Sequence, residues 1–286
     1  MTVRIGTRGS ALALAQARIV ADALGAVCEL RVISTAGDRT DRPLQELGDG
    51  IFVTALEDAL RANEIDVAVH SLKDLPTATP DDLVIAAVPT REDARDVIVT
   101  RDRAGLRGLR AGHRVGTSSP RRDAFLRAMV PGIECVPIRG NVDTRLRKVR
   151  DGEYDATVLA AAGLRRLGLD FAEAEAISLD DWPPAPGQGA LAIQMRAAAP
   201  FIARVHATLD DAATRASVET EREILRLAGA TCALPLGAYA RRDAGDIVAH
   251  AAVAGVQGIR RAQARGHAPA EVASAIAEGL GVFVRV

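Results

Sequence analysis

The chain repeats one pattern of local structure, and this repeat limits the possible folds more than any other feature. Residues 4–24 combine a short apolar strand, a Gly-Thr turn, a serine at a helix start and an amphipathic run, and residues 114–129 repeat this combination. Farther along, NEIDVAV at 63–69 is matched by GEYDATV at 152–158, in the same relative order. The 286 residues therefore indicate two similar α/β lobes built from strand-turn-helix units.

Two segments are predicted to cross between these lobes. The first lies near residues 88–95, and the second is the Pro/Gly-rich stretch WPPAPGQG at 182–189. The apolar run 190–195 that follows is predicted to be a strand returning to the first lobe, as in hinged two-lobed binding proteins. The expected boundaries are residues 1–89 with 190–208 for the first lobe and 95–183 for the second.

The rest of the chain, residues 212–286, is predicted to form a small α+β domain. Its pattern indicates a long helix, three strands and a closing helix, near residues 212–227, 236–241, 247–253, 259–265 and 270–280.

Chemically active side chains gather just after the apolar run 67–69. This run is too short for a helix and predicts a buried strand, and ligands bind at the carboxyl ends of strands in open α/β sheets. The side chains that follow this end are His70, Ser71, Lys73 and Asp74. Only two of the 36 basic residues are Lys, which indicates that Arg cannot replace Lys73. An ordinary ion pair between Lys73 and Asp74 is the alternative.

Residues 101–150 form a strongly basic window, with twelve Arg and one Lys against four acidic residues. Helix starts bind anions through their N–H groups, and Arg8, Arg121 and Arg122 add positive charge at the two repeated turns. Aromatic residues make up 3% of the chain and Phe125 is the one aromatic residue of the window, so a stacking platform for nucleic acid is missing. We expect a small polyanion between the lobes; a solvated Arg-rich face is the alternative.

The sequence argues against membrane, export and metal functions. It has no run of 18 apolar residues and enters a strand directly at its N-terminus, so we expect neither a membrane span nor a signal peptide, and a cytoplasmic protein. Cys28, Cys135 and Cys232 form no CxxC pair and the five His are scattered, so we expect no disulfide framework and no metal. The polar stretch 35–50 is expected to be a lid-like loop.

Seven motifs together resemble the hydroxymethylbilane synthase family, also called the porphobilinogen deaminase family, over nearly the whole chain. They are TRGS at 7–10, AVHSLKDLP at 68–76, GTSSPRR at 116–122, RGNV at 139–142, TRL at 144–146, GQGA at 187–190 and the turn around Cys232. The resemblance implies a cytoplasmic, monomeric transferase of tetrapyrrole (heme, chlorophyll and corrin) biosynthesis. Its expected fold class is α/β, with two similar periplasmic-binding-protein-like lobes, a central cleft and a small C-terminal α+β domain.

The implied reaction joins four porphobilinogen molecules head to tail, releases ammonia at each step and hydrolyses off linear hydroxymethylbilane. The implied cofactor is a dipyrromethane held by a thioether to Cys232, which makes 212–286 the cofactor-anchoring domain. Asp74 and Lys73 are the implied catalytic residues, since a fixed carboxylate stabilises positive charge on pyrrole nitrogens. The groups expected to bind the carboxylates of the cofactor and of the growing oligopyrrole are Arg8, Ser10, His70, Ser71, Thr117, Ser118, Ser119, Arg121, Arg122, Arg139, Gly140, Arg145 and Gln188.

Two places depart from the family pattern. The loop 35–50 lacks the lysines common in relatives, with Arg39 and Arg42 as substitutes, and the cofactor turn has Ala230-Thr231 where Gly-Gly is usual. We prefer Cys232 as the attachment site because the other two cysteines lie in a predicted strand and in a predicted buried run. A non-catalytic two-lobed polyanion-binding protein would explain the repeat and the arginines but gives Asp74 and Cys232 no role. A nucleic-acid binder would explain the basic window alone.

Overall fold

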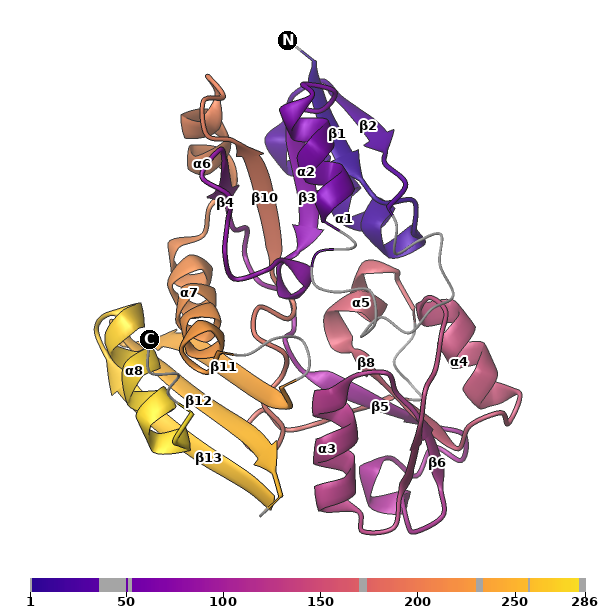
Figure 1. Ribbon diagram of the computed structural model, residues 1–286. Coiled ribbons are helices and arrows are strands. Elements are labelled where there is room, and N and C mark those ends of the chain that lie inside the picture. The colour runs from indigo at the N-terminus through magenta and orange to yellow at the C-terminus, as the bar shows by residue number, and fades with distance from the viewer. Residues whose placement is uncertain are drawn as a thin grey trace.

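The computed structural model describes residues 2–35, 50, 53–169, 174–229, 234–256 and 258–282 (Figure 1). Within these ranges the strands form two five-stranded sheets and one three-stranded sheet. The first sheet lies in the upper part of Figure 1, and the other two lie below it side by side. The predicted fold class of two similar α/β lobes with a small α+β unit is confirmed.

The first lobe is built on a sheet with the order β2-β1-β3-β10-β4. Its strands are β1 (Val3–Thr7), β2 (Cys28–Val32), β3 (Val67–Ser71), β4 (Leu83–Ala87) and β10 (Leu191–Arg196). Its helices are α1 (Ala11–Leu24), α2 (Thr54–Arg61) and α6 (Ile202–Leu209). The predicted return strand is confirmed, because β10 pairs antiparallel with both β3 and β4.

The second lobe has the sheet order β7-β6-β8-β5-β9. Its strands are β5 (Asp96–Thr100), β6 (Arg114–Gly116), β7 (Glu134–Val136), β8 (Ala156–Ala160) and β9 (Ala174–Ala176). Its helices are η4 (Leu106–Gly108), α3 (Pro120–Met129), α4 (Val142–Arg150) and α5 (Ala161–Arg166).

The sequence repeat corresponds to a repeat of topology. In the first lobe β1 is parallel to β2 and β3, and in the second lobe β6 is parallel to β7 and β8. In each lobe the strand that follows a crossing is antiparallel to its neighbour: β10 follows the second crossing and pairs with β3, and β5 follows the first crossing and pairs with β8. The carboxyl ends of β3 and β8 are therefore equivalent points in the two lobes.

The third unit is a β11-β12-β13 antiparallel sheet covered by two helices. Its elements are α7 (Ala212–Leu227), β11 (Leu236–Asp243), β12 (Asp246–Gly255), β13 (Gly258–Gly266) and α8 (Pro269–Leu280). The opposite face of this sheet packs on the second lobe, where Ala252 joins the core around Phe125 and Trp182. The third unit and the second lobe thus share buried apolar surface.

One local expectation differs from the structure. Cys135 was expected in a buried run but is half-buried, because β7 is an edge strand with a neighbour on one side. Most of the expected loop, residues 36–49, lies outside the described residues.

Candidate active site

The predicted pair Lys73 and Asp74 lies on a short 3-10 helix, η3 (Leu72–Asp74), directly after β3. Leu72 is buried and its N–H donates to the carbonyl of Ala190 at 3.0 Å, which anchors the turn between the first lobe and the second crossing. A Cβ on Gly187 would come within 3.2 Å of the Leu72 side chain, so the crossing passes close to the turn. Both charged side chains are exposed. The turn therefore presents them from a fixed backbone.

The Lys73 side chain is exposed to solvent, and protein groups also surround its ammonium. Its side chain is exposed, yet desolvation lowers the pKa of its ammonium to about 8, while Asp74 acts in the opposite direction. Arg122 of the second lobe also lowers this pKa, which places the two lobes within electrostatic reach of each other. The ammonium donates to Gln188 Oε1 at 3.1 Å. The Lys73 side chain thus reaches solvent while protein groups surround its ammonium.

One cavity brings together five of the predicted residues, namely Arg8, Ser10, His70, Ser71 and Asp74. Ser10 caps α1 by accepting a hydrogen bond from Ala13 N. Burial lowers the pKa of His70 to about 4, although its hydrogen bond to Gln194 Oε1 at 3.0 Å opposes the shift. His70 is therefore neutral near pH 7, and its Nε2–H donates to Gln194.

The cavity also contains Gln16, which sequence reasoning missed. Gln16 is buried, and its Nε2 donates to Ser71 Oγ at 2.9 Å. A polar residue within the apolar stripe of an amphipathic helix was the available signal, since buried amides need hydrogen-bond partners.

Three other predicted residues meet at Asp96, a carboxylate that the sequence did not identify. Asp96 is 0% exposed and accepts bonds from Arg121 and Arg122, both at 2.6 Å. Trp182 Nε1 donates to it at 2.7 Å and Gln188 Nε2 at 2.9 Å. Desolvation pushes the pKa of Asp96 upward, but the two guanidinium groups outweigh it and hold the pKa well below its usual range. Asp96 thus joins β5, α3 and the second crossing. We call this group the Asp96 node; its members are Asp96, Arg121, Arg122, Trp182 and Gln188.

This node accounts for several donors that were expected to bind ligand carboxylates. Arg121 also donates to the carbonyl of Pro183 at 3.0 Å, and Arg122 donates to that of Val158 at 2.8 Å. Gln188 is 1% exposed, and its amide contacts Lys73, Ala94 and Asp96. These contacts tie the Gln188 amide to protein groups at the second crossing, and its binding to ligand carboxylates stays a prediction.

A cluster of positive charge remains beside the node. Arg122 Nε and Arg139 Nη2 are buried and have no hydrogen-bond partner among the described residues. Desolvation lowers the pKa of Arg145 to about 10, and the charges of Arg122 and Arg139 act in the same direction. Arg145 Nε donates to the carbonyl of Gly140 at 2.9 Å. Buried donors without partners cost free energy, so this arginine cluster (Arg122, Arg139 and Arg145) fits an anion.

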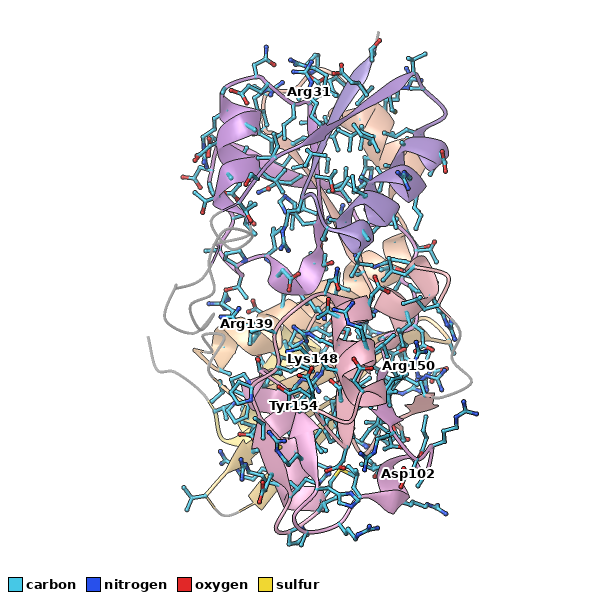
Figure 2. All side chains as sticks on the ribbon, turned by 90° about the vertical axis from the view of Figure 1, so that its right-hand side faces the viewer. Arg31, Asp102, Arg139, Lys148, Arg150 and Tyr154 are labelled. Atoms are coloured by element: carbon cyan, nitrogen blue, oxygen red, sulfur yellow. The ribbon has the colours of Figure 1, made fainter. Side chains whose placement is uncertain are left out.

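The arginine cluster lies at the end of the second lobe nearest η3. Figure 2 shows Arg139 at that end, whereas Asp102 lies at the opposite end of the lobe. The neighbouring hydroxyls organise the turn before α3: Thr117 accepts from Ser119 N, Ser118 donates to the carbonyl of Ile138, and Ser119 caps α3. Their binding to carboxylates stays a prediction.

Cys232, the predicted attachment site, lies outside the described residues, which resume at Leu234 after Gly229. α7 ends at Leu227 and β11 begins at Leu236, so the segment that contains Cys232 connects these two elements.

Comparisons with known proteins identify the family of this chain. Residues 3–204 match the family model described as porphobilinogen deaminase, dipyromethane cofactor binding domain. A porphobilinogen deaminase of Nocardia farcinica is 52% identical over 83% of this chain and 70% of its own length, and one of Roseiflexus is 48% identical over 86% and 84%. Among solved structures, the methionine binding protein MetQ aligns with 72% of this chain and 89% of its own, at 14% identity and a TM-score of 0.43. The extent of the family match and the identity to these relatives show that the chain belongs to the porphobilinogen deaminase family.

Proposed function

We propose that this chain is a hydroxymethylbilane synthase, a transferase that joins four porphobilinogen molecules head to tail with loss of ammonia and releases the linear product by hydrolysis. One observation carries the proposal beyond family membership. A carboxylate, Asp74, lies on the turn after β3 beside Lys73, and the ammonium pKa of Lys73 is lowered by Arg122, a member of an arginine cluster that has buried donors without partners among the described residues. A non-catalytic polyanion-binding protein would need the cluster but not Asp74 and Lys73.

The arginine cluster suits the substrate and the cofactor because both carry acetate and propionate groups. Arg122 Nε and Arg139 Nη2 are buried donors without a hydrogen-bond partner among the described residues, and Arg145 adds charge that no carboxylate of those residues is recorded as pairing. Carboxylates bound there would satisfy the orphaned donors and relieve the repulsion among three cations. Arg8 and Ser10 would hold groups on the first-lobe side.

Asp74 would act where positive charge develops. Loss of ammonia leaves an electron-poor carbon on the substrate, and formation of the new carbon–carbon bond places positive charge on pyrrole nitrogen until a ring proton leaves. A preorganised carboxylate stabilises that charge and can receive the proton. Lys73, held by Gln188, would keep the carboxylate in place and contribute a nearby proton donor.

The dipyrromethane cofactor supplies the pyrrole carbon to which the first substrate is joined. We place its thioether on Cys232, and the two described cysteines support this choice. Desolvation raises the pKa of Cys135 to about 12 and also raises that of Cys28, which makes both thiolates less available. The arginine cluster fits the acidic side chains of such a group.

The predicted domain boundaries are part of the proposal, and the three separate sheets support residues 1–89 with 190–208, 95–183 and 212–286 as units. A cytoplasmic, monomeric enzyme without a metal or a nucleic-acid partner remains our prediction. In the described part of the chain, no helix has the length and apolar character needed to cross a membrane.

The test compares wild type with Asp74→Asn and Asp74→Glu in single-turnover formation of enzyme–substrate adducts. Asp74→Asn keeps the shape but removes the charge, so turnover should fall by roughly 10² to 10³-fold. Asp74→Glu keeps the charge slightly displaced and should retain partial activity. Normal adduct formation in a folded Asp74→Asn protein, checked by thermal melting, would remove Asp74 from the mechanism.

A further inference from the structure

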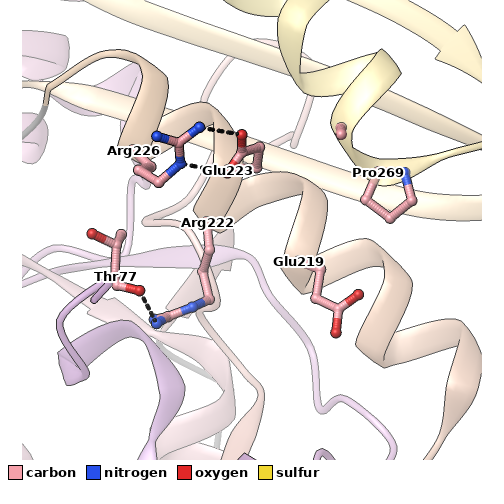
Figure 3. Close-up of a pocket in the computed structure, with 7 residues that line it drawn as sticks. Thr77, Glu219, Arg222, Glu223, Arg226 and Pro269 are labelled. Carbon is pink, nitrogen blue, oxygen red and sulfur yellow. Dashed lines mark hydrogen bonds and ion pairs between the residues drawn. The ribbon is translucent and has the colours of Figure 1, made fainter. Parts of the chain in front are cut away.

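Arg222 of α7 reaches from the third unit to the backbone that leaves the Lys73–Asp74 turn. Its Nη1 donates to the carbonyl of Leu75 at 3.0 Å, and its Nη2 donates to those of Pro76 at 2.6 Å and Thr77 at 3.2 Å. Figure 3 shows this guanidinium pointing at Thr77. We propose that Arg222 is a positioning residue, which acts on the reaction by fixing the turn that carries Asp74.

The segment between η3 and β4 makes few backbone hydrogen bonds of its own among the described residues. Leu75 N–H returns to the carbonyl of Leu72 at 3.1 Å and closes the turn, but Pro76 and Pro80 have no N–H to donate. β4 does not begin until Leu83. The carbonyls of residues 75–77 accept instead from one side chain, 145 to 147 residues away in sequence. A planar guanidinium can bind three successive carbonyls at once, which an ammonium cannot do with the same geometry.

The chemistry around Arg222 differs from that of an ordinary surface arginine. Desolvation lowers its pKa, and the recorded partners of its guanidinium in the described chain are neutral carbonyls and not a carboxylate. Arg226, one turn later on the same side of α7, lines a cavity together with Arg222, but it pairs with half-buried Glu223 at 2.7 Å (Figure 3). A desolvated cation without a counter-ion costs free energy, and the three bonds that Arg222 makes all go to the backbone of residues 75–77.

The adjacent residue on α7 shows that this helix is a junction. Glu221 is fully buried and binds Arg91 of the first crossing at 2.6 Å and Gly187 N of the second crossing at 2.7 Å. The same helix therefore holds both crossings and the exit of η3. It also leads, at its carboxyl end, into the segment that contains Cys232. α7 links the proposed cofactor anchor to the position of Asp74.

The expected effect is on the chemical step more than on binding. The arginine cluster that would bind substrate lies on the second lobe, so loss of the Arg222 bonds should leave it unchanged. A catalytic group displaced by about 1 Å can lower the rate by roughly 100-fold. This inference rests on the proposed function, since Asp74 is its target.

The experiment uses the holoenzyme with Arg222→Gln, Arg222→Lys and the control Arg226→Gln. We expect Arg222→Gln to lower kcat by about 10- to 100-fold with KM changed less than about threefold. Arg222→Lys should recover part of kcat, because an ammonium can still donate to some of the three carbonyls. Arg226→Gln should match wild type. Hydrogen exchange of the amides in residues 72–77 should rise in Arg222→Gln alone.

The outcomes separate this inference from the proposed function. A wild-type holoenzyme that does not consume porphobilinogen would reject the function, while the exchange measurement would still report on the turn. An active wild type with unchanged kcat and exchange in Arg222→Gln would overturn the inference. So would an equal loss in Arg226→Gln, or a loss of kcat that only follows the loss of folded holoenzyme in melting and intact-mass measurements. If Arg222→Gln does not fold, Arg222→Lys is judged by the same criteria.

Discussion

At the residue scale, the orientation of Gln188 follows from the charge of Asp96. The Gln188 Nε2 group donates to Asp96 and to the carbonyl of Ala94, so its Oε1 must face the Lys73 ammonium. A reversed amide would place N–H groups against a cation. The buried carboxylate therefore determines, through one amide, which atom Lys73 meets.

Removal of one cation from Asp96 should be costly. Arg121→Leu leaves a fully buried carboxylate with one guanidinium fewer, and breaking such a pair costs about 3 to 5 kcal/mol. Denaturant unfolding should show this loss, and adding Asp96→Asn should restore part of it. The control is Arg127→Leu on the exposed side of α3, whose pair with Asp123 should be worth less than about 1 kcal/mol. Equal losses in both variants would contradict the model of the node.

His70 gives a pH prediction at the same scale. Burial lowers its pKa to about 4, whereas the unfolded chain takes up the proton near pH 6.5. Between these values the unfolded state binds more protons, so the free energy of unfolding should fall as pH drops, by up to about 3 kcal/mol from this group. His70→Gln should remove this part of the slope, measured by urea unfolding from pH 7 to pH 4. The same slope in both proteins would show that His70 does not contribute.

At the element scale, the second crossing lies directly on the edge of the third sheet. Ala238 N of β11 donates to the carbonyl of Pro184 at 2.9 Å. A Cβ on Gly237 would come within 2.1 Å of the Pro183 carbonyl oxygen, a distance that no packed structure tolerates. Glycine at this position allows β11 and the crossing to approach.

Gly237→Ala should therefore push the crossing away from β11. Overpacking of this kind costs about 1 to 3 kcal/mol, which thermal melting would detect. Gly255→Ala, at the end of the neighbouring strand β12, provides the control, since a Cβ there has no atom within 4 Å among the described residues. A melting temperature for Gly237→Ala equal to that of Gly255→Ala would show that the crossing can move without cost.

At the scale of the whole molecule, two buried carboxylates connect the three units. Asp96 ties the second lobe to the second crossing, and Glu221 ties both crossings to α7 and, through Ala240 N at 2.8 Å, to the third sheet. The proposed cofactor anchor follows α7 in the chain, so it is attached to this junction.

The whole-molecule prediction concerns mass. A thioether-linked dipyrromethane should raise the intact mass of purified protein above the polypeptide value by two pyrrole units. Cys232→Ser should lack the increase, whereas Cys28→Ser and Cys135→Ser should keep it because both thiols are partly buried and have raised pKa values. An active wild type without added mass, or a modified Cys232→Ser, would reject the attachment site.

Local patterns in the sequence were enough to predict the elements and their duplication. Apolar periodicity, Gly-Thr turns and serine caps depend on neighbours within a few residues, so α1, β3, α3 and the third unit agree closely with their expected ranges. The return of β10 to the first lobe also followed from the Pro/Gly crossing before it. The motifs that resemble the family were read from the same short stretches.

Only the tertiary structure decided which charged groups meet. Asp96 lies 25 and 26 residues from its arginines, Gln188 lies 115 residues from Lys73, and Arg222 lies 147 residues from Leu75. An arginine predicted as a ligand clamp and one that neutralises a buried carboxylate look alike in sequence, because side-chain chemistry is local while its partner is set by chain topology. The sequence by itself determined the two lobes and the presence of Asp74, Lys73 and the arginines. Packing decided that Arg121 binds Asp96, that Arg139 keeps an unused donor, and that Arg222 holds the turn beside Asp74.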